Sequence, residues 1–133
     1  MPPSTRVMNL GHFLTQAAQK YPDRPALIRG DNTLSFSDLN RRVENACAAL
    51  SDLGVTKGDR ILVQSRNSFP MFEAMFASWK LGAVLVPVNS RLTEEEVAFI
   101  AENSGAKVLL YESIFASHRD VALEKGAIDA TEF

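Results

Sequence analysis

Apolar residues recur every three or four positions in four stretches of the chain, and residues that favour helix ends bound each stretch. Asn9 is the expected N-cap of the first stretch. Ser35 with Asp38, and Thr93 with Glu96, have the spacing of a capping box. The pattern predicts amphipathic helices over residues 10–21, 35–54, 68–82 and 93–105.

Short apolar runs separate these helices and predict strands over residues 60–65, 83–88 and 107–111. Two further β-capable runs, 26–29 and 33–36, flank the turn Gly30-Asp31-Asn32 and predict a small hairpin. The alternation of strand and helix between the first and the last long strand is typical of right-handed parallel βαβ units. The predicted fold class is therefore α/β.

The run 83–88 is almost entirely apolar, which predicts a central strand that helices cover on both faces. Pro87 cannot donate a backbone hydrogen bond, so regular pairing should end near it. The pattern weakens after residue 111: residues 113–125 fit one more helix, and residues 126–133 contain no evident closing element. Residues 1–133 are thus expected to form one domain that stops before it is complete.

The composition narrows the functional classes. The chain has 46% hydrophobic and 23% charged residues, which is typical of a soluble globular domain. A net charge of -2 leaves no positive field for nucleic acid, and no apolar run is long enough for a signal peptide or a membrane span. Cys47 is the single cysteine, so no internal disulfide can form and we expect a reducing, cytoplasmic location.

The sequence predicts no catalytic residue and no metal ligand in this chain. No two of its seven glycines are two residues apart, which excludes a dinucleotide-binding G-x-G-x-x-G loop. A phosphate loop, a nucleophile elbow and a zinc-binding H-E-x-x-H helix are also absent. One cysteine and two distant histidines, His12 and His118, cannot supply zinc-ligand spacing.

Two arginines stand at the expected carboxyl ends of strands, where open parallel sheets bind ligands. Arg66 and Arg91 each precede a helix N-terminus, where a cation is unfavourable unless an anion joins it. A phosphate-bearing ligand would supply that anion. Alternatively, Arg91 pairs with one of the glutamates at 94–96 and Arg66 is merely solvated, and the residues alone favour this second interpretation.

Other polar and aromatic residues fit structural roles. His12 and His118 are isolated and are expected at the surface or as caps, and Cys47 as a small buried residue. Asn67 and Asn89 should bond to loop backbone. Four residues at helical spacing are expected to pack a helix on the sheet rather than line a substrate pocket: Phe72, Met75, Phe76 and Trp79.

A series of short landmarks resembles, in order and spacing, the amino-terminal segment of adenylate-forming enzymes, a superfamily of acyl-CoA and aryl-CoA synthetases, peptide-synthetase adenylation domains and luciferases. The resemblance runs from about residue 9 to about residue 111. The landmarks are Ala26-Leu-Ile, Leu34-Ser-Phe-Ser-Asp-Leu39, Ala49-Leu50, Leu53-Gly54-Val55, Lys57-Gly-Asp-Arg60, Asn67-Ser68, Lys80-Leu-Gly-Ala-Val84, Pro87-Val-Asn-Ser-Arg-Leu92 and Ser104-Gly-Ala-Lys-Val108. The stretch from Pro87 to Leu92 is similar to the acyl-CoA synthetase branch.

The resemblance implies an ATP-dependent acid-CoA ligase that uses ATP, Mg²⁺ and CoA to activate a carboxylic acid. Family members are several times longer, and their phosphate loop, magnesium-binding Glu and catalytic Lys lie beyond residue 133. The resemblance therefore implies an amino-terminal part that is inactive alone. In some relatives the Arg of the Asn-x-Arg-Leu stretch, here Arg91, approaches the phosphates of the CoA nucleotide.

Two alternatives stay open. The first alternative to a ligase part is a stand-alone, non-catalytic α/β interaction module. The second is part of a peptide-synthetase adenylation domain, which delivers its product to a carrier thiol. In every case an unpaired sheet edge is expected to favour a homodimer.

Overall fold

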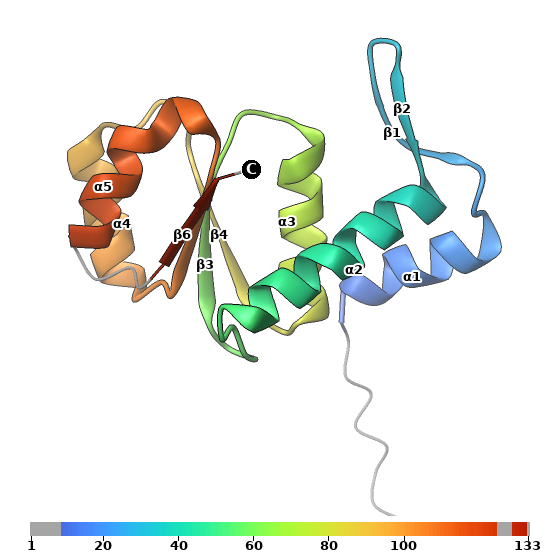
Figure 1. Cartoon of the computed structure of the whole chain (residues 1–133), viewed down its shortest axis with the longest axis horizontal. Helices are drawn as coiled ribbons and strands as arrows, with labels where there is room; N and C mark the ends of the chain where they lie inside the picture. Colours follow the sequence, from blue (N-terminus) through green and yellow to red (C-terminus); the bar gives the residue numbers. More distant parts are fainter. Residues whose placement is uncertain (1–8, 125–128, 133) are drawn as a thin grey trace, which may run out of the picture.

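The computed structural model describes residues 9–124 and 129–132, and Figure 1 shows a layered arrangement of helices around one parallel sheet. The helices are α1 (Gly11–Lys20), α2 (Phe36–Asp52), α3 (Phe69–Lys80), α4 (Glu94–Ser104), the short 3-10 helix η1 (Ser113–Phe115) and α5 (Ala116–Glu124). The strands are β1 (Pro25–Arg29), β2 (Asn32–Ser35), β3 (Arg60–Gln64), β4 (Val84–Val88), β5 (Val108–Tyr111) and β6 (Asp129–Glu132).

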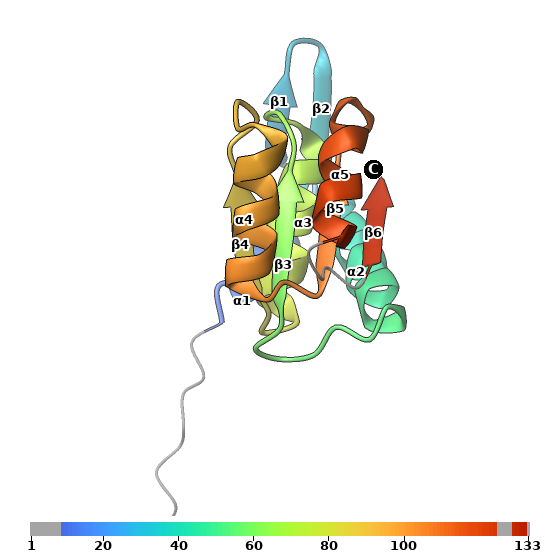
Figure 2. The same ribbon diagram turned by 90° about the vertical axis from the view of Figure 1, so that its left-hand side faces the viewer.

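The main sheet has the strand order β4-β3-β5-β6, and all its described pairings are parallel. Helices α2 and α3 lie on one face and α4 and α5 on the other (Figure 1). The strands β1 and β2 form a separate antiparallel hairpin, which lies beyond the end of the sheet toward which the strands point (Figure 2). The predicted α/β class and the predicted hairpin are confirmed.

Alternate residues of the central strands face opposite layers. Ile61 and Val63 join the hydrophobic cluster that includes α2 and α3, whereas Leu62 and Leu109 join the cluster that includes α4 and α5. These side chains are fully or almost fully buried, and each such burial stabilises the fold by about 1.5–3 kcal/mol before entropy is counted. Strand β3 is therefore the centre of both cores.

Local sequence signals set the helix ends much as expected. The Ser68 hydroxyl accepts the Met71 amide at 3.2 Å, and Thr93 and Glu96 form a complete reciprocal capping box. Helix α1 begins at Gly11, with Leu10 in the N-cap position. The Asn9 side chain nevertheless accepts the Gly11 amide at 2.8 Å, so it serves the first turn from one residue further out.

The other expected capping box, between Ser35 and Asp38, is only half formed. The Ser35 hydroxyl accepts the Asp38 amide at 3.1 Å. The Asp38 carboxylate accepts the Ser35 hydroxyl instead of the Ser35 amide. Helix α2 thus has a side-chain N-cap without the reciprocal backbone bond.

The expectation of a central strand over residues 83–88 is wrong. Strand β4 pairs with β3 alone among the described strands, because the chain leaves β4, crosses over β3 and places β5 on the other side. Val84 is 48% exposed at this edge. Pairing ends at Val88, one residue after Pro87, near where it was expected to end, and an edge strand tolerates a proline because one side of its backbone needs no partner.

The expectations for the end of the chain also need correction. The single helix predicted over 113–125 is divided into η1 and α5. Asp129–Glu132, expected to contain no closing element, forms β6 and pairs in parallel with β5. The segment has no apolar pattern that would reveal a strand, and its pairing uses backbone groups. The rest of the expected tail, residues 125–128 and 133, lies outside the described residues.

Candidate functional site

The loops that follow β3, β4 and β5 leave the carboxyl end of the sheet. After β3 the chain runs to β4 on one side, and after β4 it returns across β3 to β5 on the other side. The direction of the connections therefore reverses between β3 and β5, and open parallel sheets bind ligands at such a switch point. Ser65–Ser68 and Glu112 are the polar segments that follow these two strands.

An ion pair joins the two loops at the switch point. The Arg66 amide donates to Glu112 Oε2 at 3.0 Å, and Arg66 Nε donates to Glu112 Oε1 at 3.0 Å. The guanidinium bonds hold the pKa of Glu112 below its ordinary value, with help from the Arg66 amide and the charge of Arg29. The expectation that Arg66 is merely solvated is wrong, since the chain itself supplies the expected anion.

Arg91 lies in the loop after β4 and its side chain is exposed. Its amide donates to Asn89 Oδ1 at 2.9 Å, as predicted for Asn89. Among the described residues no ion pair joins Arg91 to the glutamates of α4, so the expected alternative of an intrachain pair is not observed. Glu96 is used by the capping box, where its Oε2 accepts the Thr93 amide at 2.8 Å. Arg91 thus keeps a free guanidinium in the described part of the chain.

The structure also reveals a contact between a buried and a half-buried polar side chain that sequence reasoning missed. Gln64 is fully buried at the end of β3, and its Nε2 lies 2.7 Å from Nδ1 of His118 in α5. Nearby, Arg119 donates to the Tyr111 hydroxyl at 2.9 Å. His118 is therefore not isolated, which corrects the expectation. The only available signal was a glutamine that directly follows the apolar run Ile61-Leu62-Val63.

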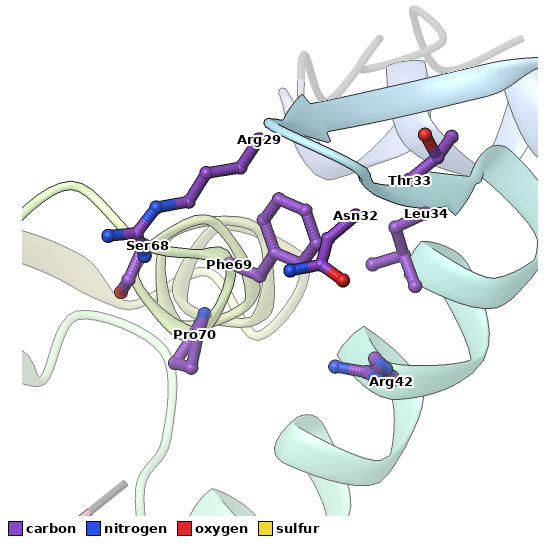
Figure 3. A pocket seen from close by; sticks show the side chains of 8 residues that line it. All are labelled: Arg29, Asn32, Thr33, Leu34, Arg42, Ser68, Phe69 and Pro70. Atoms are coloured by element: carbon purple, nitrogen blue, oxygen red, sulfur yellow. The ribbon is translucent and has the colours of Figure 1, made fainter.

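A hollow of about 380 Å³ lies between the hairpin, α2 and the start of α3. Figure 3 shows Arg29 reaching from the hairpin and Arg42 from α2, with Asn32 directed toward Phe69. Arg42 is paired with Glu73 at 3.1 Å. Neither arginine stood out in the sequence, because each lies in an element whose pattern is explained by packing alone.

The remaining candidates keep structural roles. Cys47 is half-buried, and this burial raises the pKa of its thiol. Phe76 and Trp79 make an edge-to-face contact, but the buried face of α3 consists of the small residues Ala74, Ala77 and Ser78. Phe72 was expected to pack against the sheet, but it is 38% exposed and does not belong to the packing surface.

Two further expectations about single residues have different outcomes. His12 is exposed, as predicted. Asn67 makes no side-chain bond to loop backbone among the described residues, so that expectation is not observed. It lines a shallow hollow with Phe69 and Phe72.

Within residues 9–124 and 129–132, no three acidic, histidine or cysteine side chains gather closely enough to hold a metal ion. Over the same residues, no helix combines the length and the apolar character that crossing a membrane requires. The described residues therefore offer no metal-binding cluster beside the switch point.

Comparison with known protein families gives a match to the AMP-binding enzymes over residues 14–132. The chain belongs to the AMP-binding enzyme family. The match includes both Arg66 and Arg91, together with the whole main sheet and the hairpin. The resemblance to adenylate-forming enzymes is confirmed.

Individual relatives of this AMP-binding chain include fatty acid ligases. It is 34% identical over 109 residues to a medium/long-chain-fatty-acid–CoA/3-oxocholest-4-en-26-oate–CoA ligase of Mycobacterium marinum, covering 82% of this chain and 20% of the relative. It is 38% identical over 98 residues to the fatty acid–[acyl-carrier-protein] ligase ScoC of Streptomyces coeruleorubidus, covering 74% and 19%. The chain thus spans about a fifth of the length of these curated relatives.

Solved structures agree with this assignment. The N-terminal domain of FACL13 from Mycobacterium tuberculosis superposes with a TM-score of 0.87 at 31% identity, covering 94% of this chain and 34% of that one. This AMP-binding chain therefore has the fold of an N-terminal domain portion of a fatty acyl-CoA synthetase.

Proposed function

We propose that residues 1–133 are an incomplete amino-terminal part of the large domain of an ATP-dependent acid-CoA ligase. In the proposed reaction a carboxylate attacks the α-phosphorus of ATP, which forms an acyl-adenylate and releases pyrophosphate. The CoA thiol then attacks the acyl carbon, which forms a thioester and releases AMP. The family match supports the adenylation step, and the names of the relatives support a fatty acid as the carboxylate.

We assign Arg91 a contact with the phosphates of the CoA nucleotide. The observation that supports it is an exposed guanidinium with no ion pair among the described residues, next to the N-terminus of α4. The bond from the Arg91 amide to Asn89 holds the loop in a defined turn, so little of its backbone freedom would be lost on binding. A phosphate there would gain both the charge of Arg91 and the positive end of the helix dipole.

The test of this assignment uses the full-length ligase. Arg91→Ala should raise the KM for CoA about tenfold, because one charge-assisted hydrogen bond is worth about 1.5 kcal/mol. Carboxylate-dependent exchange of pyrophosphate into ATP should stay unchanged, because that step precedes CoA binding. Arg41→Ala is the control, since Arg41 is an exposed arginine of α2 that pairs with Asp38. An unchanged KM for CoA in the Arg91 variant would end the assignment.

The isolated chain is proposed to be inactive. The support is its length, because the chain spans about a fifth of the curated relatives and so contains only a small part of their residues. Purified chain supplied with Mg-ATP and a panel of fatty and aromatic acids should give no pyrophosphate exchange above the blank. Exchange above the blank would show that catalytic residues are present here, and would contradict both this proposal and the alternative of a non-catalytic module.

A carrier-protein thiol is a second candidate acceptor, because the relative ScoC is a ligase of fatty acid and acyl carrier protein. Both candidate reactions share the adenylation step, and they differ in the thiol that then accepts the acyl group. Release of AMP from preformed acyl-adenylate by CoA alone would support the first candidate, and release by a phosphopantetheinylated carrier protein alone would support the second.

The cytoplasmic location and the homodimer stay predictions, and light scattering of the purified chain tests the homodimer.

A further inference from the structure

Glu112 is held at the switch point in the way that a protein holds a bound oxyanion. Glu112 Oε2 accepts the Arg66 amide at 3.0 Å and Arg66 Nε at 3.3 Å, and Glu112 Oε1 accepts Arg66 Nε at 3.0 Å together with Arg66 Nη2. Most surface ion pairs use side chains alone, as Arg42 and Glu73 do in this chain. A backbone amide combined with an arginine fork matches the geometry of phosphate as well as that of carboxylate.

The charge around Glu112 exceeds what one carboxylate neutralises. Arg29, at the end of β1, lines a hollow with Asn67 and Ser68 of the loop that carries Arg66, and its positive charge helps to lower the pKa of Glu112. No ion pair of Arg29 is present among the described residues. Arg29 and Arg66 together carry two positive charges against the single charge of Glu112. A dianion would therefore neutralise this position better than Glu112 does.

The position in the fold gives a second, independent argument. Arg66 follows β3 and Glu112 follows β5, so their contact spans the reversal of the chain connections. Ligands of open parallel sheets bind at this point, because the loops on its two sides diverge. In this chain the carboxylate of Glu112 occupies the switch point between β3 and β5.

We propose that the Arg66 amide and guanidinium, together with the Arg29 guanidinium, form a binding site for a phosphate group, with Glu112 as its internal occupant. We call this set of groups the Arg66 cradle. The proposal does not depend on the acid-CoA ligase assignment, and it concerns a different loop from Arg91. The ligand class is a phosphate dianion, either free or as a monoester.

The test is a phosphate titration of the 133-residue chain followed by NMR of its backbone amides at constant ionic strength. Glu112→Gln removes the internal charge with little change in shape. In this variant inorganic phosphate should shift the Arg66 amide in a saturable way, with an affinity at least tenfold above that of the unaltered chain. Adding Arg66→Gln to Glu112→Gln should abolish the saturable shift. Glycerol 3-phosphate, titrated in parallel, distinguishes a monoester site from a site for free phosphate.

A matched control separates a built site from an unpaired arginine. Glu73→Gln frees Arg42, which has no backbone amide beside it in its ion pair, and should create no saturable phosphate shift. Thermal unfolding of each variant confirms that it is folded at the titration temperature. Equal binding in the Glu73→Gln and Glu112→Gln variants, or no saturation in the folded Glu112→Gln variant, would overturn the proposal.

Discussion

The two ends of the parallel sheet use their charges differently. At the amino end, Arg60 Nε donates to the Ser104 carbonyl at 2.7 Å, and the Lys107 ammonium donates to the Gly54 carbonyl. Both cations thus meet carbonyls at the carboxyl ends of helices, where the helix dipole is negative. Asp59 accepts the Thr56 amide at 2.7 Å, so the acidic group there also bonds to backbone, in addition to a longer ion pair with Lys107 at 3.4 Å.

At the carboxyl end of the sheet, one arginine pairs with a carboxylate and the other has no ion-pair partner among the described residues. Arg66 bonds to the side chain of Glu112, and Arg91 has no ion pair in the described part of the chain. Gln64 is buried there, and its Oε1 has no hydrogen-bond partner among the described residues. The comparison indicates that the charges at the amino end mainly join strands to helices, whereas at the carboxyl end the Arg91 guanidinium and Gln64 Oε1 have no partner among the described residues.

The largest expected change in stability comes from substituting Gly105, which lies at the amino end of the sheet. This residue ends α4 at φ 61°, and an added Cβ would lie 2.8 Å from Nη2 of Arg60. Gly105→Ala should lower the free energy of unfolding by about 1–2 kcal/mol for the left-handed backbone, with a further loss because the guanidinium must move. Urea unfolding measures both contributions.

Gly58→Ala is the control for the backbone contribution. Gly58 also has a positive φ, of 87°, but an added Cβ there meets no atom within 4 Å. If both variants lose the same free energy, the guanidinium of Arg60 is not held in place and the contrast between the two ends weakens.

The next effect compares one arginine from each end. Arg60→Ala should lower the free energy of unfolding by about 1 kcal/mol, because helix carbonyls lose a cation that caps them. Arg66→Ala should cost less, because a solvent-exposed ion pair contributes little to stability. Chemical denaturation at low and high salt distinguishes them, and a larger loss for Arg66→Ala would reverse the comparison.

The smallest effect is a difference in acid sensitivity. The Thr56 amide is the main cause of the lowered pKa of Asp59, and the Arg66 guanidinium is the main cause of the lowered pKa of Glu112. A lowered folded-state pKa stabilises the fold above the ordinary carboxyl pKa, and this contribution is lost as the pH falls through the folded-state value. Asp59→Asn and Glu112→Gln should each reduce the loss of stability below about pH 5.

Salt should separate these two acidic groups. Raising the ionic strength should diminish the Glu112 contribution more, because salt screens a pair of exposed charges more than an amide hydrogen bond. Unfolding curves from pH 7 to pH 3 at two salt concentrations give the measurement. Equal salt sensitivity would show that the charge of Lys107 matters as much to Asp59 as the charge of Arg66 does to Glu112.

Helices and strands were largely predictable from the sequence. The predicted helix over 68–82 is α3, and its cap at Ser68 is present, because periodicity and capping depend on residues within one or two turns. The strand over 83–88 was predicted in nearly the right place but in the wrong position of the sheet. Apolar content reports that a strand is buried, and it does not report which strands are its neighbours.

The candidate site was predictable only in part. Sequence reasoning placed Arg66 and Arg91 at strand ends, and the structure agrees. It missed Glu112 as the partner of Arg66, because the two residues are 46 positions apart. It also missed the contact of Gln64 with His118, which spans 54 positions. No local pattern encodes contacts at such distances.

The sequence by itself determined the alternation of strands and helices, most of their ends, the α/β class and the resemblance to adenylate-forming enzymes. These features depend on spacing and on neighbouring residues, which a sequence states directly. Only the tertiary structure decided that β4 lies at an edge, that β6 extends the sheet and that Glu112 occupies the switch point. Those outcomes depend on the direction in which each crossover places the next strand, and that direction is set by packing over the whole sheet.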